Sequence, residues 1–90
     1  MNDPLEEDRI VTNLEKSQAG LDMIKEAIIS ELQHHADGMT NAEITHTLGL
    51  ESDSEGKMRN YLAWSILGIL MNEGKIKSHP VGRNRTYFLI

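Results

Sequence analysis

The feature that most constrains this chain is an apolar helix pattern that ends at a glycine and leads directly into a basic hairpin pattern. Apolar residues recur at helical spacing between about residues 55 and 73, which predicts one long helix that Gly74 ends. Residues 75–90 predict two short strands around a glycine turn, with Arg83 and Arg85 beside the turn. Arginines at a hairpin tip have no core to pack into, so contact with a phosphate backbone is the explanation that we favour.

The first third of the chain predicts two helices separated by a break. Residues 4–18 carry a narrow apolar stripe, which is typical of a docked extra helix, a dimerisation element or a frayed tail. Residues 17–20, Ser-Gln-Ala-Gly, look like the break. Residues 21–36 repeat apolar side chains at steps of three and four and predict an amphipathic helix. We therefore expect an N-terminal helical extension over residues 1–19 and a separate domain over residues 20–90.

A capping box predicts where the next, short helix begins. Thr40 is followed three residues later by Glu43, so each side chain can bind the backbone N–H of the other residue. Gly49 is expected to end this helix. The segment from Leu50 to Gly56 is polar, acidic and rich in turn-forming residues.

In this order of elements, residues 20–90 resemble a winged helix-turn-helix domain. The resemblance rests on Thr40 to Leu50, on the apolar helix that ends in Asn72-Glu73-Gly74, and on the stretch Gly82-Arg83-Asn84-Arg85-Thr86-Tyr87-Phe88-Leu89. That last stretch is similar to the Gly-Arg…Tyr-x-Leu wing of many prokaryotic winged-helix transcriptional regulators and of DNA-recognition domains attached to restriction enzymes. The resemblance implies a mainly α fold with a small β-hairpin: a three-helix core plus a wing, here with an extra N-terminal helix.

One departure from the family pattern is the segment between the two helices of the motif. Residues 50–56 are longer and more acidic than the tight turn that such domains usually have. Acidic groups near a phosphate surface either oppose close docking of the recognition helix or displace its base contacts further along the helix.

The resemblance implies twelve candidate DNA-binding residues. They are Thr40, Asn41, Lys57, Arg59, Asn60, Tyr61, Trp64, Lys75, Lys77, Arg83, Asn84 and Arg85. The recognition helix, about residues 55–73, would enter the major groove by its N-terminal half, where Asn60 suits an adenine edge and Arg59 a guanine. Lys57 suits a phosphate.

The remaining candidates suit the DNA backbone. Backbone N–H groups at Thr40 and Asn41, where the preceding helix begins, can bind a phosphate. Arg83 and Arg85 in the wing, about residues 75–90, would hold flanking phosphates or enter the minor groove. The two wing lysines at 75 and 77 would add to the positive field.

Several of these residues also have purely structural interpretations. Tyr61 and Trp64 lie three apart on a very apolar helix, which is typical of core or interface residues. Thr40 is fully explained as an N-cap. Lys75 and Lys77 are also typical of charges that protect an exposed strand edge.

The charge of the chain is distributed unevenly. The net charge of −5 speaks against a nucleic-acid ligand, but residues 1–56 hold thirteen acids and three bases, whereas residues 57–90 hold one acid and six bases. Binding depends on the local potential, so the second part of the chain remains suited to DNA. The chain has no cysteine, no secretory signal pattern and no apolar run long enough for a membrane span, so we expect a cytoplasmic protein without a membrane partner.

No pattern in the sequence indicates catalysis. The four histidines lack the i, i+4 spacing that helps assemble a zinc site, and Gly56-Lys57 lacks the glycine-rich loop that phosphate-binding enzymes use. We therefore expect no enzyme, no metal and no cofactor.

The function expected from these observations is binding of double-stranded DNA, as a transcriptional regulator or a DNA-recognition module. The alternative is a protein-interaction winged helix that serves as an assembly surface without nucleic acid, and RNA binding ranks below DNA binding. We expect a homodimer to form through one of two surfaces, either the N-terminal helix or the apolar face of the long helix.

Overall fold

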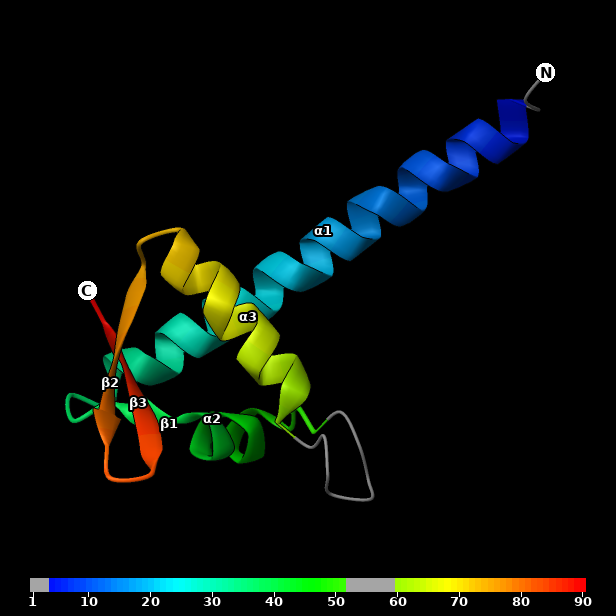
Figure 1. Ribbon diagram of the computed structural model, residues 1–90. Helices are drawn as coiled ribbons and strands as arrows, with labels where there is room; N and C mark the ends of the chain where they lie inside the picture. Colours follow the sequence, from blue (N-terminus) through cyan, green and yellow to red (C-terminus); the bar gives the residue numbers. More distant parts are fainter. Residues whose placement is uncertain (1–3, 52–59) are drawn as a thin grey trace.

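Helices make up most of the described chain, and a small antiparallel sheet completes it (Figure 1). The computed structural model describes residues 4–51 and 60–90. The elements in these ranges are α1 (Pro4–Gln33), β1 (Met39–Thr40), α2 (Asn41–Leu48), α3 (Tyr61–Asn72), β2 (Ile76–Val81) and β3 (Asn84–Leu89). The mainly α fold with a small hairpin that the sequence predicted is therefore confirmed.

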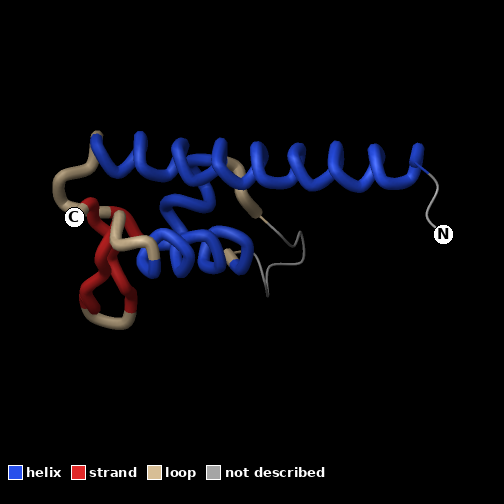
Figure 2. The backbone as a smooth tube through the Cα atoms, turned by 90° about the horizontal axis from the view of Figure 1, so that it is seen from above, coloured by secondary structure: helices blue, strands red, loops and turns tan. Residues whose placement is uncertain are grey.

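The first helix is one continuous element of 30 residues, so the predicted break at residues 17–20 is wrong. The Ser17 hydroxyl donates to the Asn13 carbonyl 2.9 Å away, which satisfies this polar side chain within the helix. Gly20 lowers helix stability by about 1 kcal/mol relative to alanine, but a single glycine does not end a helix. The N-terminal half of α1 projects beyond the rest of the molecule (Figures 1 and 2).

The core lies where the second half of α1, the two shorter helices and the sheet meet. Its fully buried side chains include Ile28 of α1, Ile44 of α2, Leu67 and Leu70 of α3, and Ile76 of β2. The predicted buried stripe of the long helix is confirmed. Leu62, Ile69 and Met71 of the same helix remain 37–39% exposed, so its apolar surface is only partly covered by this chain.

The sheet has the strand order β1-β3-β2, and both pairings are antiparallel. Sequence reasoning predicted the hairpin but missed β1, in which Met39 pairs with Tyr87 and Thr40 with Thr86. Gly38, just before β1, has φ +81°, and a Cβ there would lie 2.8 Å from the Tyr87 carbonyl oxygen. Glycine thus allows the chain before α2 to approach β3 closely.

The hairpin turn forms where the sequence predicted it. Gly82 has φ +63°, and Val81 pairs with Asn84 across the turn. Ile76 and Tyr87 are buried on the core face of the hairpin, and Leu89 on that face is half-buried. The predicted start of the long helix at about residue 55 lies outside the described residues. Within those residues, no helix has the length and apolarity needed to cross a membrane.

Candidate functional site

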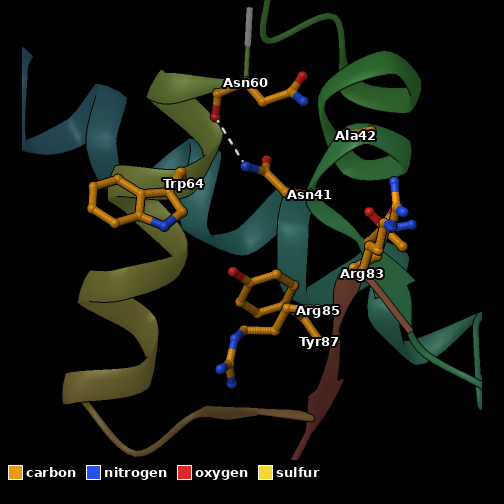
Figure 3. Close-up of a pocket in the computed structure, with 9 residues that line it drawn as sticks. Asn41, Ala42, Asn60, Trp64, Arg83, Arg85 and Tyr87 are labelled. Atoms are coloured by element: carbon orange, nitrogen blue, oxygen red, sulfur yellow. Dashed lines mark hydrogen bonds between the residues drawn. The ribbon is translucent and has the colours of Figure 1, made fainter. Parts of the chain in front are cut away.

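Three elements meet around an open pocket of about 280 Å³ (Figure 3). The start of α2, the start of α3 and the β2–β3 hairpin all contribute to it. Its lining residues are Thr40, Asn41, Ala42, Asn60, Trp64, Arg83, Asn84, Arg85 and Tyr87. We call this surface the hairpin pocket. It brings together residues that are up to 47 positions apart in the sequence.

Seven of the twelve sequence-predicted site residues line the hairpin pocket. These seven are Thr40, Asn41, Asn60, Trp64, Arg83, Asn84 and Arg85. Tyr61 lies next to it, with its ring centroid 5.8 Å from that of Trp64. Lys57 and Arg59 lie outside the described residues, so the structure does not place them.

The capping box fixes the start of α2 at the pocket. The Glu43 backbone N–H donates to Thr40 Oγ1 at 3.2 Å, and the Thr40 N–H donates to Glu43 Oε1 at 3.0 Å. The first backbone N–H groups of a helix have no acceptor within the helix. In the first turn of α2, the capping box satisfies only one of them, the N–H of Glu43. Asn41 and Ala42 form that turn and line the pocket, so the positive end of the α2 dipole lies there.

The Asn41 side chain connects the two helices. Its Nδ2 donates to the Asn60 carbonyl at 3.1 Å, and its Oδ1 accepts a hydrogen bond from the Thr45 hydroxyl at 3.1 Å (Figure 3). These two bonds hold the start of α2 beside the residue that precedes α3. Asn41 therefore positions the pocket through its side chain, while its backbone N–H remains suited to an anionic ligand.

The two arginines approach the pocket from the hairpin. Arg85 Nη1 donates to Ser78 Oγ at 2.9 Å, and Arg85 pairs with Pro80 across the hairpin. A guanidinium has five N–H donors, so this bond leaves donors for a ligand. In Figure 3, Arg83 lies beside Ala42 and Arg85 lies on the side of the pocket nearer α3. An extended anionic ligand would therefore meet a guanidinium at two separate points.

The aromatic residues of α3 are at the surface. Tyr61 is 52% exposed and Trp64 is 57% exposed, so the core interpretation of these two residues is wrong. Their rings contact each other at the start of α3, with an interplanar angle of 39°. Such an exposed pair provides a large apolar surface that is suited to contact with a ligand or a partner.

The two lysines of the hairpin lie apart from its arginines. Lys77 pairs with Phe88 and lines a separate hollow that the end of α1 also lines. Strand neighbours alternate between faces, so Lys77 is on the opposite face from Ser78, to which Arg85 binds. Lys75 precedes β2, where its backbone N–H donates to the Leu70 carbonyl at 3.0 Å. Neither lysine lines the hairpin pocket.

Sequence reasoning missed two residues of the pocket, Ala42 and Tyr87. Tyr87 is a core residue that is only 3% exposed, and it also forms part of the pocket wall. The alternation of side chains along a strand could have identified it, because Tyr87 is two residues from Arg85 and therefore lies on the same face of the hairpin. Ala42 could have been found as the second residue of a helix whose capping box is evident in the sequence.

Glu43 gives the capping box a dependence on pH. The hydrogen bond from the Thr40 backbone N–H, together with the Thr40 hydroxyl, holds the pKa of the Glu43 carboxyl below its ordinary value of 4.5. Because the folded-state pKa is lowered, this carboxylate contributes its full stabilisation above pH 4.5. The contribution is lost as the pH falls through the folded-state pKa.

We expect Glu43→Gln to reduce the loss of stability on acidification. Glutamine can keep the capping hydrogen bond but does not titrate. Melting temperatures measured from pH 7 to pH 3 should therefore fall less steeply for Glu43→Gln than for the wild type. Glu26→Gln, which removes the same charge from an exposed site on α1, is the matched control. Parallel curves for wild type and Glu43→Gln would contradict the assignment.

No metal site is evident in the part of the chain that the structure describes. No group of three or more His, Asp or Glu side chains there is arranged to hold an ion. Comparison of the chain with protein-family models, with curated proteins and with solved structures found no match.

Proposed function

We propose that this chain is a winged helix-turn-helix protein that binds double-stranded DNA as a homodimer and has no catalytic activity of its own. In this proposal α2 is the first helix of the motif, α3 is the recognition helix and the β2–β3 hairpin is the wing. The protein would act as a transcriptional regulator or as the DNA-recognition module of a larger system. A cytoplasmic location is part of the same proposal.

The observation that carries the proposal is the hairpin pocket itself. Two arginines, the positive end of a helix and residues at the start of the proposed recognition helix line one concave surface. Guanidinium groups and helix N-termini are both preferred partners of phosphate oxygens. A DNA backbone supplies phosphates in series, so it can engage the separate points that Arg83 and Arg85 occupy.

The distribution of acidic residues supports the same orientation. The sequence of α1 carries seven acids and three bases. In Figure 2, α1 runs along one side of the molecule and the tip of the hairpin lies on the opposite side. The field at the hairpin is therefore less affected by these acids than the net charge of −5 suggests.

The proposed recognition helix offers two kinds of contact. Asn60, with Lys57 and Arg59 before it in the sequence, supplies the donors and acceptors that read base edges. Exposed Trp64 supplies an apolar surface for a sugar or a thymine methyl group. Asn60 directly precedes α3 and Trp64 lies near its start, and both line the hairpin pocket, so the described residues of both kinds come from this end of the helix.

Salt titration tests the proposal directly. If the protein neutralises about four phosphates, a plot of log K against log salt should fall with a slope of about −3.6. The measurement is fluorescence anisotropy of a labelled 20-base-pair duplex at salt concentrations from 50 to 300 mM. Affinity that does not change with salt would contradict the proposal. The single strands and an RNA duplex of the same sequence serve as comparison ligands.

The second candidate function is a protein-assembly surface. It is favoured by the exposed apolar residues of α3, namely Tyr61, Leu62, Trp64, Ile69 and Met71. An amide chemical-shift map with duplex DNA separates the two functions. Shifts concentrated at residues 40–42, 60–64 and 83–85 would support DNA binding, whereas an unchanged spectrum would favour the assembly surface.

A further inference from the structure

A line of hydrogen bonds runs from the interior of α2 to the first turn of α3, and we call it the bridge. Thr45 of α2 is only 1% exposed, and its hydroxyl donates to Asn41 Oδ1 at 3.1 Å. Asn41 Nδ2 in turn donates to the Asn60 carbonyl at 3.1 Å (Figure 3). The same carbonyl accepts the backbone N–H of Trp64 at 2.9 Å. The bridge therefore ends on a carbonyl that also takes part in the backbone hydrogen bonding of α3.

The hydroxyl of Thr45 is used differently from those of two serines in the other helices. A serine or threonine inside a helix can donate to the backbone carbonyl four residues earlier. Ser17 in α1 and Ser65 in α3 both donate in this way. Thr45 donates instead to the side chain of Asn41, which is the residue four positions earlier. The Thr45 hydroxyl therefore supports a neighbouring side chain and not the backbone of its own helix.

The chemistry of the three groups fixes which way the Asn41 amide points. A backbone carbonyl can only accept a hydrogen bond, so the Asn60 carbonyl requires the amide nitrogen of Asn41. The amide oxygen then faces Thr45, whose hydroxyl can donate. Without that donor, Asn41 Oδ1 would lose this partner, and the side chain would be held less firmly towards Asn60.

Asn41 also lies between the two parts of the proposed DNA surface. The residue before it, Thr40, pairs with Thr86 of β3, which holds the start of α2 against the hairpin. The side chain of Asn41 contacts Asn60, which is 19 positions later and directly precedes α3. The hairpin and α3 are therefore both held to the same short segment, residues 40–41. A change in the bridge would alter the position of α3 relative to the hairpin.

We propose that Thr45 and Asn41 are positioning residues for DNA recognition. The bridge holds the start of α3 where its side chains can read bases while the hairpin and the start of α2 hold phosphates. This inference rests on the proposed function and names residues that set its sequence specificity. Thr45 is buried and does not line the hairpin pocket, so it does not contact DNA. A change at Thr45 can therefore affect recognition only through the bridge or through the stability of the fold.

Amide NMR spectra of the free protein at pH 7 test the bridge without DNA. Thr45→Val keeps the shape of the side chain but removes the donor, whereas Thr45→Ser keeps a donor. Thr45→Val should shift the backbone amide signal of Trp64, and Thr45→Ser should leave it close to the wild-type position. Asn41→Asp should also shift the Trp64 signal, because a carboxylate cannot donate to the Asn60 carbonyl. A Trp64 signal that Thr45→Val leaves unchanged would overturn the proposal.

Duplex binding tests the role of the bridge in recognition. The probes are a labelled duplex that the wild type selects from a random pool and a scrambled duplex of the same composition, both measured by fluorescence anisotropy. Thr45→Val should lower the preference for the selected duplex by about tenfold, which corresponds to the loss of one good base contact. The slope of log K against log salt on the scrambled duplex should not change, because this slope counts phosphate contacts. Thr45→Ser should match the wild type in both quantities.

Circular dichroism shows whether Thr45→Val is folded at the temperature of the binding measurement. If it is not, Asn41→Asp takes its place, since a carboxylate is favourable in the first turn of a helix. Both duplexes meet the added charge of Asn41→Asp, so the ratio of the two affinities cancels its general effect. This ratio should also fall by about tenfold.

The outcomes separate the positioning role from the proposed function. A wild type with salt-dependent binding but no preferred sequence would overturn the positioning role and leave the proposed function standing. A preference that survives Thr45→Val, despite a shifted Trp64 signal, would do the same. Equal losses on the selected and scrambled duplexes would mean that Thr45 only maintains the fold, which also overturns the positioning role. A wild type that binds no duplex would overturn the proposed function and the positioning role together.

Discussion

Replacing Arg83 and Arg85 together with alanine is expected to weaken duplex DNA binding by about 100-fold at 0.15 M salt. Both arginines line the hairpin pocket, and a hydrogen bond to a charged group contributes about 1.5 kcal/mol or more, which is roughly tenfold in affinity. The slope of log K against log salt should also change, from about −3.6 to about −1.8, because two phosphate contacts are lost. Fluorescence anisotropy of a labelled duplex measures both quantities.

The matched control for this variant lies on the same hairpin. Lys75→Ala with Lys77→Ala removes the same number of positive charges, but neither lysine lines the hairpin pocket. This control should lose no more than about fivefold in affinity, from the weaker general field. Equal losses in the two double variants would mean that charge alone matters and that the pocket is not the site. No loss in the arginine variant would remove the hairpin from the proposed interface.

Replacing Gly38 with alanine is expected to destabilise the fold by about 3 kcal/mol or more. The residue has φ +81°, where a side chain is strained, and an added Cβ would lie 2.5 Å from Thr86 Cγ2 and 2.8 Å from the Tyr87 carbonyl oxygen. The left-handed conformation costs about 1–2 kcal/mol, and overpacking adds about 1–3 kcal/mol. The Tyr87 carbonyl belongs to the central strand, so it has little freedom to move aside.

Urea unfolding of the purified chain measures this effect, with Gly20→Ala as the comparison. Gly20 lies within α1. Apart from its chain neighbours and the nearby backbone of α1, no described atom would lie within 4 Å of a Cβ added there. Alanine there should stabilise the helix by about 0.5–1 kcal/mol. The two glycine variants should therefore change stability in opposite directions. A free energy of unfolding for Gly38→Ala within about 0.5 kcal/mol of the wild type would contradict the close packing of this segment on β3.

The parts of the fold that the sequence predicted are those with local signals. The Thr40–Glu43 capping box, the buried stripe of α3 and the turn at Gly82 each depend on residues within a few positions of one another. The strand β1 has no such signal, because two residues carry no alternation and their partners in β3 lie 46 to 48 positions later. The break at residues 17–20 was wrongly predicted because a lone glycine weakens a helix without ending it.

Seven of the nine residues that line the hairpin pocket were candidates from the sequence, but the sequence did not show which of the twelve candidates lie together. Sequence alone shows that Lys77 alternates with Ser78 along a strand, but it does not show which face of the hairpin turns towards the helices. The structure places Arg85 on the face of Ser78 and Tyr87, and Lys77 on the other face. The hydrogen bond from Asn41 to the Asn60 carbonyl could not be predicted either. It joins the start of α2 to the residue before α3, and the sequence between these two residues has no pattern that indicates such a contact.

The position of β3 between β1 and β2 has a consequence for how the protein is made. Of these three strands, β3 is made after the other two, and both of them are hydrogen bonded to it. Until residues 84–89 have emerged, Met39 and Thr40 have no strand to pair with, and the start of α2 lacks the support that orients it. The surface proposed for DNA therefore comes together only after β3 has been made, and a nascent chain that holds only the helices does not yet carry it.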